Sequence, residues 1–201
     1  MGEMQLLLLS LGLALVCGLH AHHTCSKEHQ PDVSKKWWMQ LSGTWYTVAL
    51  ASNVTAKIEE GGPLRIFVQK LIVENGNLRA VFFKRENGKC IQFSVSANPP
   101  EKDSPMKVKY SGINDLYIKS FKEDEYVIFI LYNHNNKEVT LWGHLFGRTP
   151  DLSDDIKKKF EEICINAGLK KEHILDVSEA GILRKPHLCL MGIPPPPSSK
   201  E

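Results

Sequence analysis

The feature that most constrains the fold is a series of short β-rich segments, evenly spaced and separated by turn residues. Alternating apolar positions rich in Val, Ile, Thr and aromatic residues predict strands. Asn75-Gly76 and Asn87-Gly88 follow two of the segments and are strong hairpin signals. Eight strands at this spacing favour an antiparallel barrel or sandwich, a mainly β fold. The expected strands are residues 44–50, 64–73, 78–84, 89–97, 106–111, 116–121, 125–132 and 138–146.

One amphipathic helix is expected after the last of these strands. Ser153 suits its N-cap, and the acidic residues that follow suit the positive end of the helix dipole. Apolar residues then recur at helical spacing until Gly168, which ends the helix. We expect this helix to cover apolar side chains on the outside of the sheet, such as Val81 and Phe83. Residues 174–177 are expected to form a short final strand.

The two ends of the chain indicate a secreted protein. The apolar run from Leu6 to Leu19 is shorter than the roughly 20 residues that span a bilayer, and it resembles the core of a signal peptide. We therefore predict a signal peptide at residues 1–21 and no stable membrane insertion. Residues 190–201 contain four consecutive prolines and are expected to form a flexible tail.

The rest of the chain is expected to form one domain with one sizeable core. Removal of the leader takes away Glu3, which changes the formal net charge from +2 to +3. This small excess is not clustered, so we expect no binding of nucleic acid. We expect a monomer or a weak dimer.

Cysteines and a glycosylation motif agree with secretion. Cys25, Cys90, Cys164 and Cys189 remain after the leader, and the sequence alone allows three full pairings of them. The tripeptide Asn53-Val54-Thr55 predicts N-glycosylation at Asn53. The alternative is that so short a motif is not used.

Two further motifs resemble the lipocalin family. Gly43-Thr44-Trp45 is similar to the family's G-x-W signature, and Gly147-Arg148 is similar to its G-R signature after the eighth strand, about one hundred residues later. Residues 57–65 resemble odorant-binding proteins, and residues 147–156 and 174–178 resemble urinary and salivary pheromone carriers. The family's middle signature, T-D-Y before strand seven, is not intact in this chain.

The resemblance implies an eight-stranded antiparallel up-and-down β-barrel with one C-terminal α-helix packed on its wall. Residues 43–189 would form the barrel and helix, and residues 22–42 would close one end. Trp45 would lie near the closed end with Arg148 across its ring, a contact of about 0.5 to 2 kcal/mol. Trp38 and Leu41 would plug that end. The family pattern also implies a disulfide between Cys90 and Cys189.

Alignment with the pheromone carriers, combined with strand alternation, predicts a ligand cavity that carries no fixed charge. Such a lining favours a small apolar or volatile ligand of about ten to fifteen heavy atoms. Tyr110 and His144 are the polar exceptions, and each either binds the ligand or is satisfied by protein groups. The expected lining residues are Leu64, Ile66, Val68, Leu71, Ala80, Phe82, Val95, Val108, Tyr110, Leu116, Phe129, Leu131, Trp142, His144 and Phe146.

Three classes of function remain open at this point. The first is an extracellular carrier of odorant or pheromone type, which we favour. The second is a cavity isomerase, but residues 62–73 lack the thiol that it needs, and Cys164 is more typical of a buried small hydrophobe. The third is an interaction protein that binds a cell-surface receptor. We expect no enzyme activity, no cofactor and no metal, because the amino-terminal histidines lack the spacing of a closed zinc site.

Overall fold

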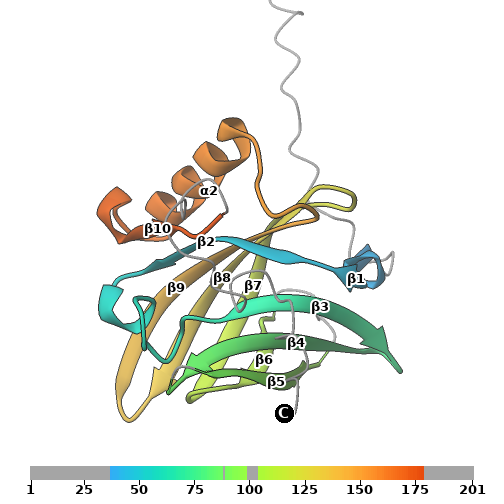
Figure 1. Cartoon of the computed structure of the whole chain (residues 1–201), viewed down its shortest axis with the longest axis horizontal. Coiled ribbons are helices and arrows are strands. Elements are labelled where there is room, and N and C mark those ends of the chain that lie inside the picture. Colours follow the sequence, from blue (N-terminus) through green and yellow to red (C-terminus); the bar gives the residue numbers. More distant parts are fainter. Residues whose placement is uncertain (1–36, 88, 99–103, 179–201) are drawn as a thin grey trace, which may run out of the picture. The chain divides into compact units, whose positions relative to one another are not determined.

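The computed structural model of the protein describes residues 37–87, 89–98 and 104–178 (Figure 1). These residues belong to one compact unit of the chain, residues 33–201. The predicted signal peptide and the Pro-rich tail lie outside the described residues. In the described ranges, no helix has the length and apolar character needed to cross a membrane.

The described residues form ten strands, one α-helix and three short 3-10 helices. The helix α2 is Asp154–Asn166, and the 3-10 helices are η1 Trp37–Leu41, η2 Thr55–Lys57 and η3 Lys171–His173. The strands are β1 Gly43–Thr44, β2 Tyr46–Ser52, β3 Phe67–Glu74, β4 Asn77–Glu86, β5 Lys89–Ala97, β6 Met106–Lys109, β7 Ile113–Lys122, β8 Tyr126–Asn135, β9 Glu138–Gly147 and β10 Ile174–Asp176.

The sheet is an antiparallel up-and-down barrel, as predicted. Strands β3 to β9 pair with their sequence neighbours, and β2 pairs with β9. The chain closes the ring because β1, one residue ahead of β2, pairs with β3, with Gly43 opposite Leu71. The predicted first strand is thus divided at Trp45. This division, together with the short final strand β10 that was expected at residues 174–177, accounts for the ten observed strands.

Turn residues set the strand boundaries. Asn75 and Gly76 both have positive φ, 50° and 81°, as expected for the two central residues of a type I′ hairpin turn. The strand predicted to begin at Leu64 instead begins at Phe67. The backbone N–H of Leu64 donates to the carbonyl of Lys57 at 2.8 Å, so Leu64 belongs to the preceding loop rather than to the ladder.

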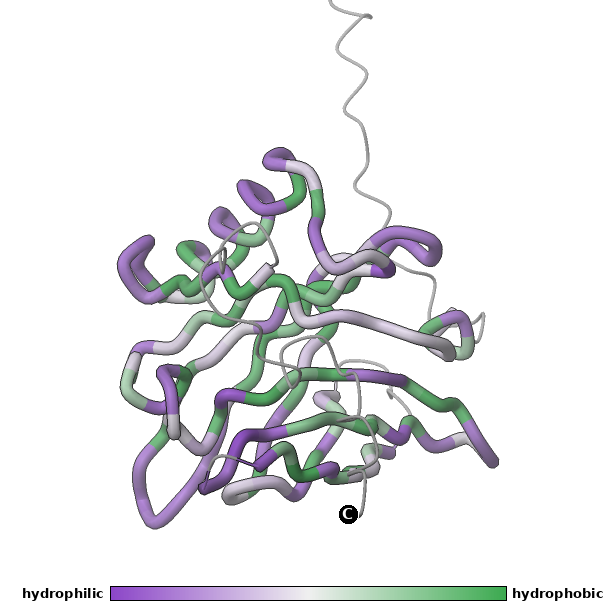
Figure 2. The backbone as a smooth tube through the Cα atoms, viewed as in Figure 1, coloured by the Kyte–Doolittle hydropathy of each residue, from purple (hydrophilic) through white to green (hydrophobic). Residues whose placement is uncertain are grey.

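Helix α2 packs on the outside of the barrel beside β2 and β9 (Figure 1). Ser153 is the N-cap residue, although its side chain makes no capping hydrogen bond. Gly168, with φ +104°, follows the helix end as predicted. Hydrophobic and hydrophilic positions alternate along α2 (Figure 2), and the buried ones are Ile156, Phe160 and Cys164.

The prediction that the helix covers Val81 and Phe83 was wrong. Both side chains are buried, yet α2 packs against a cluster from β2, β8 and β9 rather than against β4. The helix comes close to β9 at Gly143, where an added Cβ would lie 3.2 Å from the Cys164 sulfur. The barrel wall therefore separates two cores, one inside the barrel and one under α2.

One end of the barrel is closed by Trp45 and Arg148. Trp45 is fully buried, and its indole N–H donates to the carbonyl of Leu41 at 2.7 Å. The Arg148 guanidinium lies 3.7 Å from the centre of the Trp45 ring. A Cβ on Gly43 would lie 2.7 Å from an Arg148 nitrogen, and Gly43 has φ +123°, so this position requires glycine.

The same guanidinium joins three segments through backbone carbonyls. It donates to Gln40, Ser42 and Thr44 at 3.0 to 3.2 Å, and its Nε donates to Glu123 at 2.9 Å. Arg148 thereby holds η1, β1 and the loop between β7 and β8 together.

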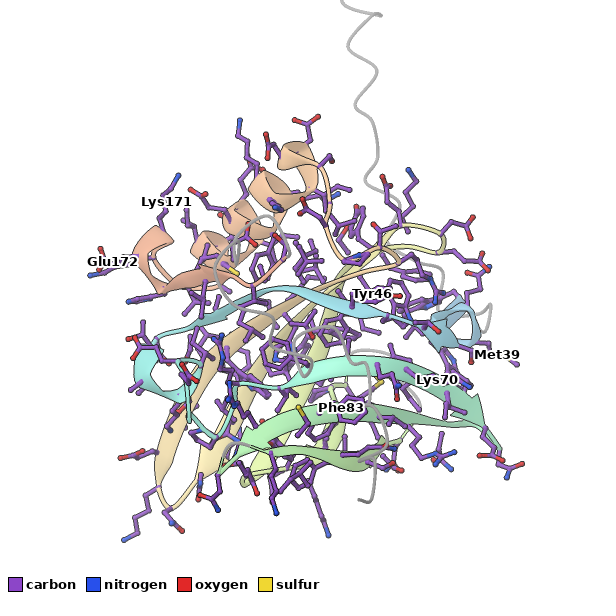
Figure 3. All side chains as sticks on the ribbon, viewed as in Figure 1. Met39, Tyr46, Lys70, Phe83, Lys171 and Glu172 are labelled. Carbon is purple, nitrogen blue, oxygen red and sulfur yellow. The ribbon has the colours of Figure 1, made fainter. Side chains whose placement is uncertain are left out.

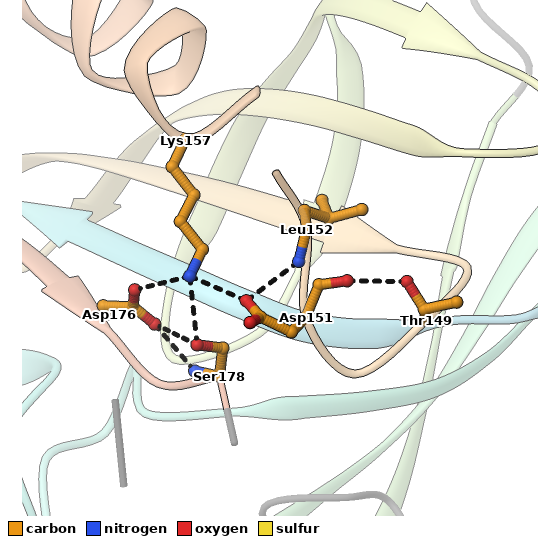
Figure 4. A network of polar contacts seen from close by, with 6 residues as sticks. All are labelled: Thr149, Asp151, Leu152, Lys157, Asp176 and Ser178. Atoms are coloured by element: carbon orange, nitrogen blue, oxygen red, sulfur yellow. Dashed lines mark hydrogen bonds and ion pairs between the residues drawn. The ribbon is translucent and has the colours of Figure 1, made fainter. Parts of the chain in front are cut away.

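A second polar network fixes the segment after the barrel (Figure 4). The Lys157 ammonium on α2 pairs with Asp151 at 2.7 Å and with Asp176 at 3.0 Å, and it donates to the Ser178 hydroxyl at 3.3 Å. The network connects the loop after β9, the first turns of α2 and the end of β10. By contrast, Lys171 and Glu172 of η3 extend away from the barrel (Figure 3).

The two described cysteines differ in state. Cys164 is free and buried, and burial raises the pKa of its thiol to about 12. Cys90 is disulfide-bonded. The sulfur with which it pairs lies outside the described residues, so the pairing with Cys189 stays a prediction.

Replacement of Trp45 by alanine should destabilise the fold by about 3 to 5 kcal/mol, because it removes a fully buried indole and the surface on which Arg148 lies. Chemical denaturation measures this loss. Trp37→Ala is the control, because Trp37 is only partly buried, and its loss should be smaller. A Trp45→Ala protein that keeps its melting temperature but loses ligand would contradict the structural assignment.

Peptide mapping under non-reducing conditions should recover a peptide pair that joins Cys90 to Cys189. The loop so closed contains about 100 residues, for which chain entropy gives an upper figure of about 4.7 kcal/mol. Reduction should lower the melting temperature accordingly. A pair that joins Cys90 to Cys25 would refute the assignment.

Candidate functional site

The barrel holds an apolar cavity of about 80 Å³. Strands β3 to β9 contribute nearly all of its wall, because alternate residues of each strand point inward. The lining residues are Ile66, Val68, Leu71, Leu78, Ala80, Phe82, Val95, Ala97, Val108, Tyr110, Asn114, Leu116, Phe129, Leu131, Trp142, His144 and Phe146.

The structure brings together every predicted lining residue except Leu64. Leu64 is buried in the loop ahead of β3 and does not border the cavity. That these residues contact a ligand stays a prediction. Three lining residues were missed, namely Leu78, Ala97 and Asn114. The alternation that turns Ala80 and Val95 inward also turns Leu78 and Ala97 inward, so this signal was present in the sequence. Asn114 lies two residues before Leu116 on β7 and was missed because the strand was expected to begin at residue 116.

Aromatic side chains make the cavity narrow. The Phe82 ring meets the Tyr110 ring edge-on with 5.0 Å between centroids. On the opposite wall, the centroids of Phe129 and Phe146 are 5.4 Å apart. Such edge-to-face packing is favourable beyond the area that it buries, so the ring pairs help to stabilise the cavity wall.

Two of the polar lining residues are occupied by protein partners. The Tyr110 hydroxyl donates to the carbonyl of Pro63 at 2.9 Å, and burial raises the pKa of this phenol to about 12. The Asn114 amide donates to the carbonyl of Tyr110 at 2.8 Å, and its oxygen accepts from Asn133 at 2.9 Å. Each of these side chains therefore serves the wall itself.

The other two polar lining residues, Trp142 and His144, each have a nitrogen with no hydrogen-bond partner among the described residues. These are the Trp142 indole nitrogen and Nε2 of His144, and both are buried. Burial lowers the pKa of His144 to about 3, since desolvation disfavours the charged ring. His144 is consequently neutral near pH 7, and the cavity wall is uncharged.

The arrangement suits the binding of an apolar molecule. The described lining holds no carboxylate, lysine, arginine or cysteine. Cys164 lies outside the cavity, in the cluster between α2 and the barrel wall, where its raised pKa keeps it a thiol. The walls thus supply apolar surface and a few hydrogen-bonding groups, which is the pattern of a small-molecule site.

Comparison with known proteins agrees with this architecture. Residues 42–181 match the model of the lipocalin / cytosolic fatty-acid binding protein family. Trichosurin of Trichosurus vulpecula is 48% identical over 176 residues, which cover 88% of this chain and 98% of that protein. Major urinary protein 4 of Mus musculus is 36% identical over 173 residues, covering 86% of this chain and 94% of that protein.

A solved structure of a relative has a similar fold. The crystal structure of the possum milk whey lipocalin trichosurin, with bound 4-ethylphenol, superposes with a TM-score of 0.65 at 47% identity. It covers 69% of this chain and 97% of that chain. The residues that match the family model, 42–181, include the ten strands, Trp45 and Arg148 at the closed end, and the residues that line the cavity. This chain is therefore a member of the lipocalin / cytosolic fatty-acid binding protein family.

Proposed function

We propose that this protein is an extracellular carrier of small, neutral, apolar molecules of odorant or pheromone type. The observation that carries the proposal is the barrel cavity, whose described wall is apolar and free of charge. Such a wall favours ligands that are poorly soluble in water, at about 25 cal/mol per Å² of apolar surface removed from it.

The size of the cavity favours compact ligands. At about 80 Å³ it is well below the several hundred Å³ of sites for drug-sized molecules. Trichosurin has been crystallised with 4-ethylphenol, a compound with a single ring. We extend that size class to this chain, in preference to retinoids or long fatty acids. An affinity of about 1 μM corresponds to roughly 8 kcal/mol, which suits so few atoms.

An extracellular location is supported by three features. The amino-terminal apolar run has the length of a signal peptide. Trichosurin is described as a milk whey lipocalin. Asn53 lies exposed at the end of β2, where an attached glycan would meet solvent, although its amide oxygen accepts from the backbone of Leu141 at 2.9 Å.

Displacement of a fluorescent probe should reveal binding of small volatile compounds with a Kd of about 1 μM. Phe82→Ala should enlarge the site and shift preference to bulkier ligands, because Phe82 borders the cavity. Tyr110→Phe and His144→Ala test two of the polar lining residues in the same assay. Val139→Ala is the control, since Val139 is 54% exposed. If no volatile compound displaces the probe and no cavity variant alters preference, the carrier function fails and a role in protein interaction replaces it.

The buried histidine predicts a pH dependence of stability. In the unfolded chain the His144 pKa is about 6.5, so its proton is taken up preferentially by the unfolded state as the pH falls below that value. Stability should therefore be full above pH 6.5 and should fall by up to about 1.4 kcal/mol per pH unit on acidification toward pH 4.5. His144→Phe should lose this part of the slope in urea unfolding. Equal slopes for both proteins would contradict the burial of a neutral ring.

A further inference from the structure

We infer that the preferred ligand carries a hydroxyl group, which is bound jointly by Trp142 and His144. The inference rests on the proposed carrier function and names the chemistry that this cavity selects. It starts from the two nitrogens that the protein leaves without a partner.

Trp142 and His144 form one polar position in an otherwise apolar wall. Of the side chains that the structure describes, these two alone have a buried nitrogen or oxygen without a hydrogen bond. They are two residues apart on β9, so both point into the barrel. Their rings meet at nearly a right angle, 80°, with 4.4 Å between centroids. Both side chains border the cavity, so a ligand bound there lies against this pair of rings.

The hydrogen-bonding groups of the two rings determine which ligand group can bind both. An indole N–H only donates, whereas a neutral imidazole has one donor and one acceptor nitrogen. When the ring proton of His144 is on Nδ1, Nε2 is an acceptor, and one hydroxyl group can accept from the Trp142 indole while it donates to Nε2. A ketone oxygen has no hydrogen to donate, and a hydrocarbon satisfies neither ring.

Neither nitrogen has a hydrogen-bond partner among the described residues. A buried polar group without a partner is costly, and a ligand that supplies the partner recovers that cost. The remaining polar lining residues do not compete for the hydroxyl, because Tyr110 donates to Pro63 and the Asn114 amide is held by backbone and Asn133. The hydroxyl is thus expected at β9 rather than near Tyr110.

Three ligands of equal size test this inference: 4-ethylcyclohexanol, 4-ethylcyclohexanone and 1-ethyl-4-methylcyclohexane. Their affinities for the wild-type protein, His144→Phe and Trp142→Phe are measured by probe displacement. Each variant should lose about ten-fold affinity for the alcohol relative to the hydrocarbon, the equivalent of one hydrogen bond. For His144→Phe, the affinity for the ketone should change by the same factor as the affinity for the hydrocarbon, because neither ligand donates a hydrogen bond to His144. Comparison of ratios removes the different water solubilities of the ligands.

Tyr110→Phe is the matched control, because its hydroxyl is already bound to Pro63. It should change the affinities for alcohol and hydrocarbon by the same factor. A second measurement does not depend on affinity. The indole N–H resonance of Trp142, assigned through Trp142→Phe, should move downfield with the alcohol and stay in place with the hydrocarbon.

The outcomes separate the two proposals. If all three ligands displace the probe but the alcohol-to-hydrocarbon ratio is the same in wild type and His144→Phe, the hydroxyl inference is overturned and the carrier function stands. If none of the ligands displaces the probe, the carrier function itself fails. An unmoved Trp142 resonance in the presence of bound alcohol would also overturn the inference.

Discussion

The stacking of Arg148 on Trp45 is the contact on which the barrel depends. The first strand must pair with β3 at one end and with β9 at the other, and Trp45 is the residue at which it changes partner. Arg148, directly after β9, covers that residue and binds the carbonyls of η1 and β1. Because Trp45 and Arg148 cover this end of the barrel, the space inside the sheet is a cavity that is closed at one end.

Much of this arrangement follows from the sequence, because strand alternation has a period of two and a closed barrel gives each strand only two environments. Ala80 and Phe82 point inward for that reason alone. Leu64 could not be placed correctly, since a hydrogen bond to Lys57 holds it in a loop that the apolar pattern does not reveal. The position of α2 over β9 was equally hidden, because an apolar helix face does not specify which strands it will cover.

The unpartnered nitrogens of Trp142 and His144 could not be predicted from the sequence, for a different reason. Whether a buried polar group is satisfied depends on every atom around it, and Tyr110 and His144 were equivalent candidates by pattern. In the structure Tyr110 serves a backbone carbonyl and His144 does not. Trp142 was predicted only as one of the lining residues. The polar character of the site thus comes from what neighbouring groups leave unbound, which only three-dimensional packing decides.

Strand β9 belongs to two environments at once. Its residues Trp142, His144 and Phe146 border the cavity, whereas Leu141 and Leu145 belong to the cluster under α2, and Gly143 admits the close approach of Cys164. A residue on a hairpin turn can vary without disturbing either surface. Along β9, an exchange on one face shifts the backbone that positions the other. Diversification toward new ligands is cheaper on β5, whose outward residues Gln92, Ser94 and Ser96 are exposed. Lineages that change their ligand would accordingly leave β9 nearly unaltered and explore the opposite wall.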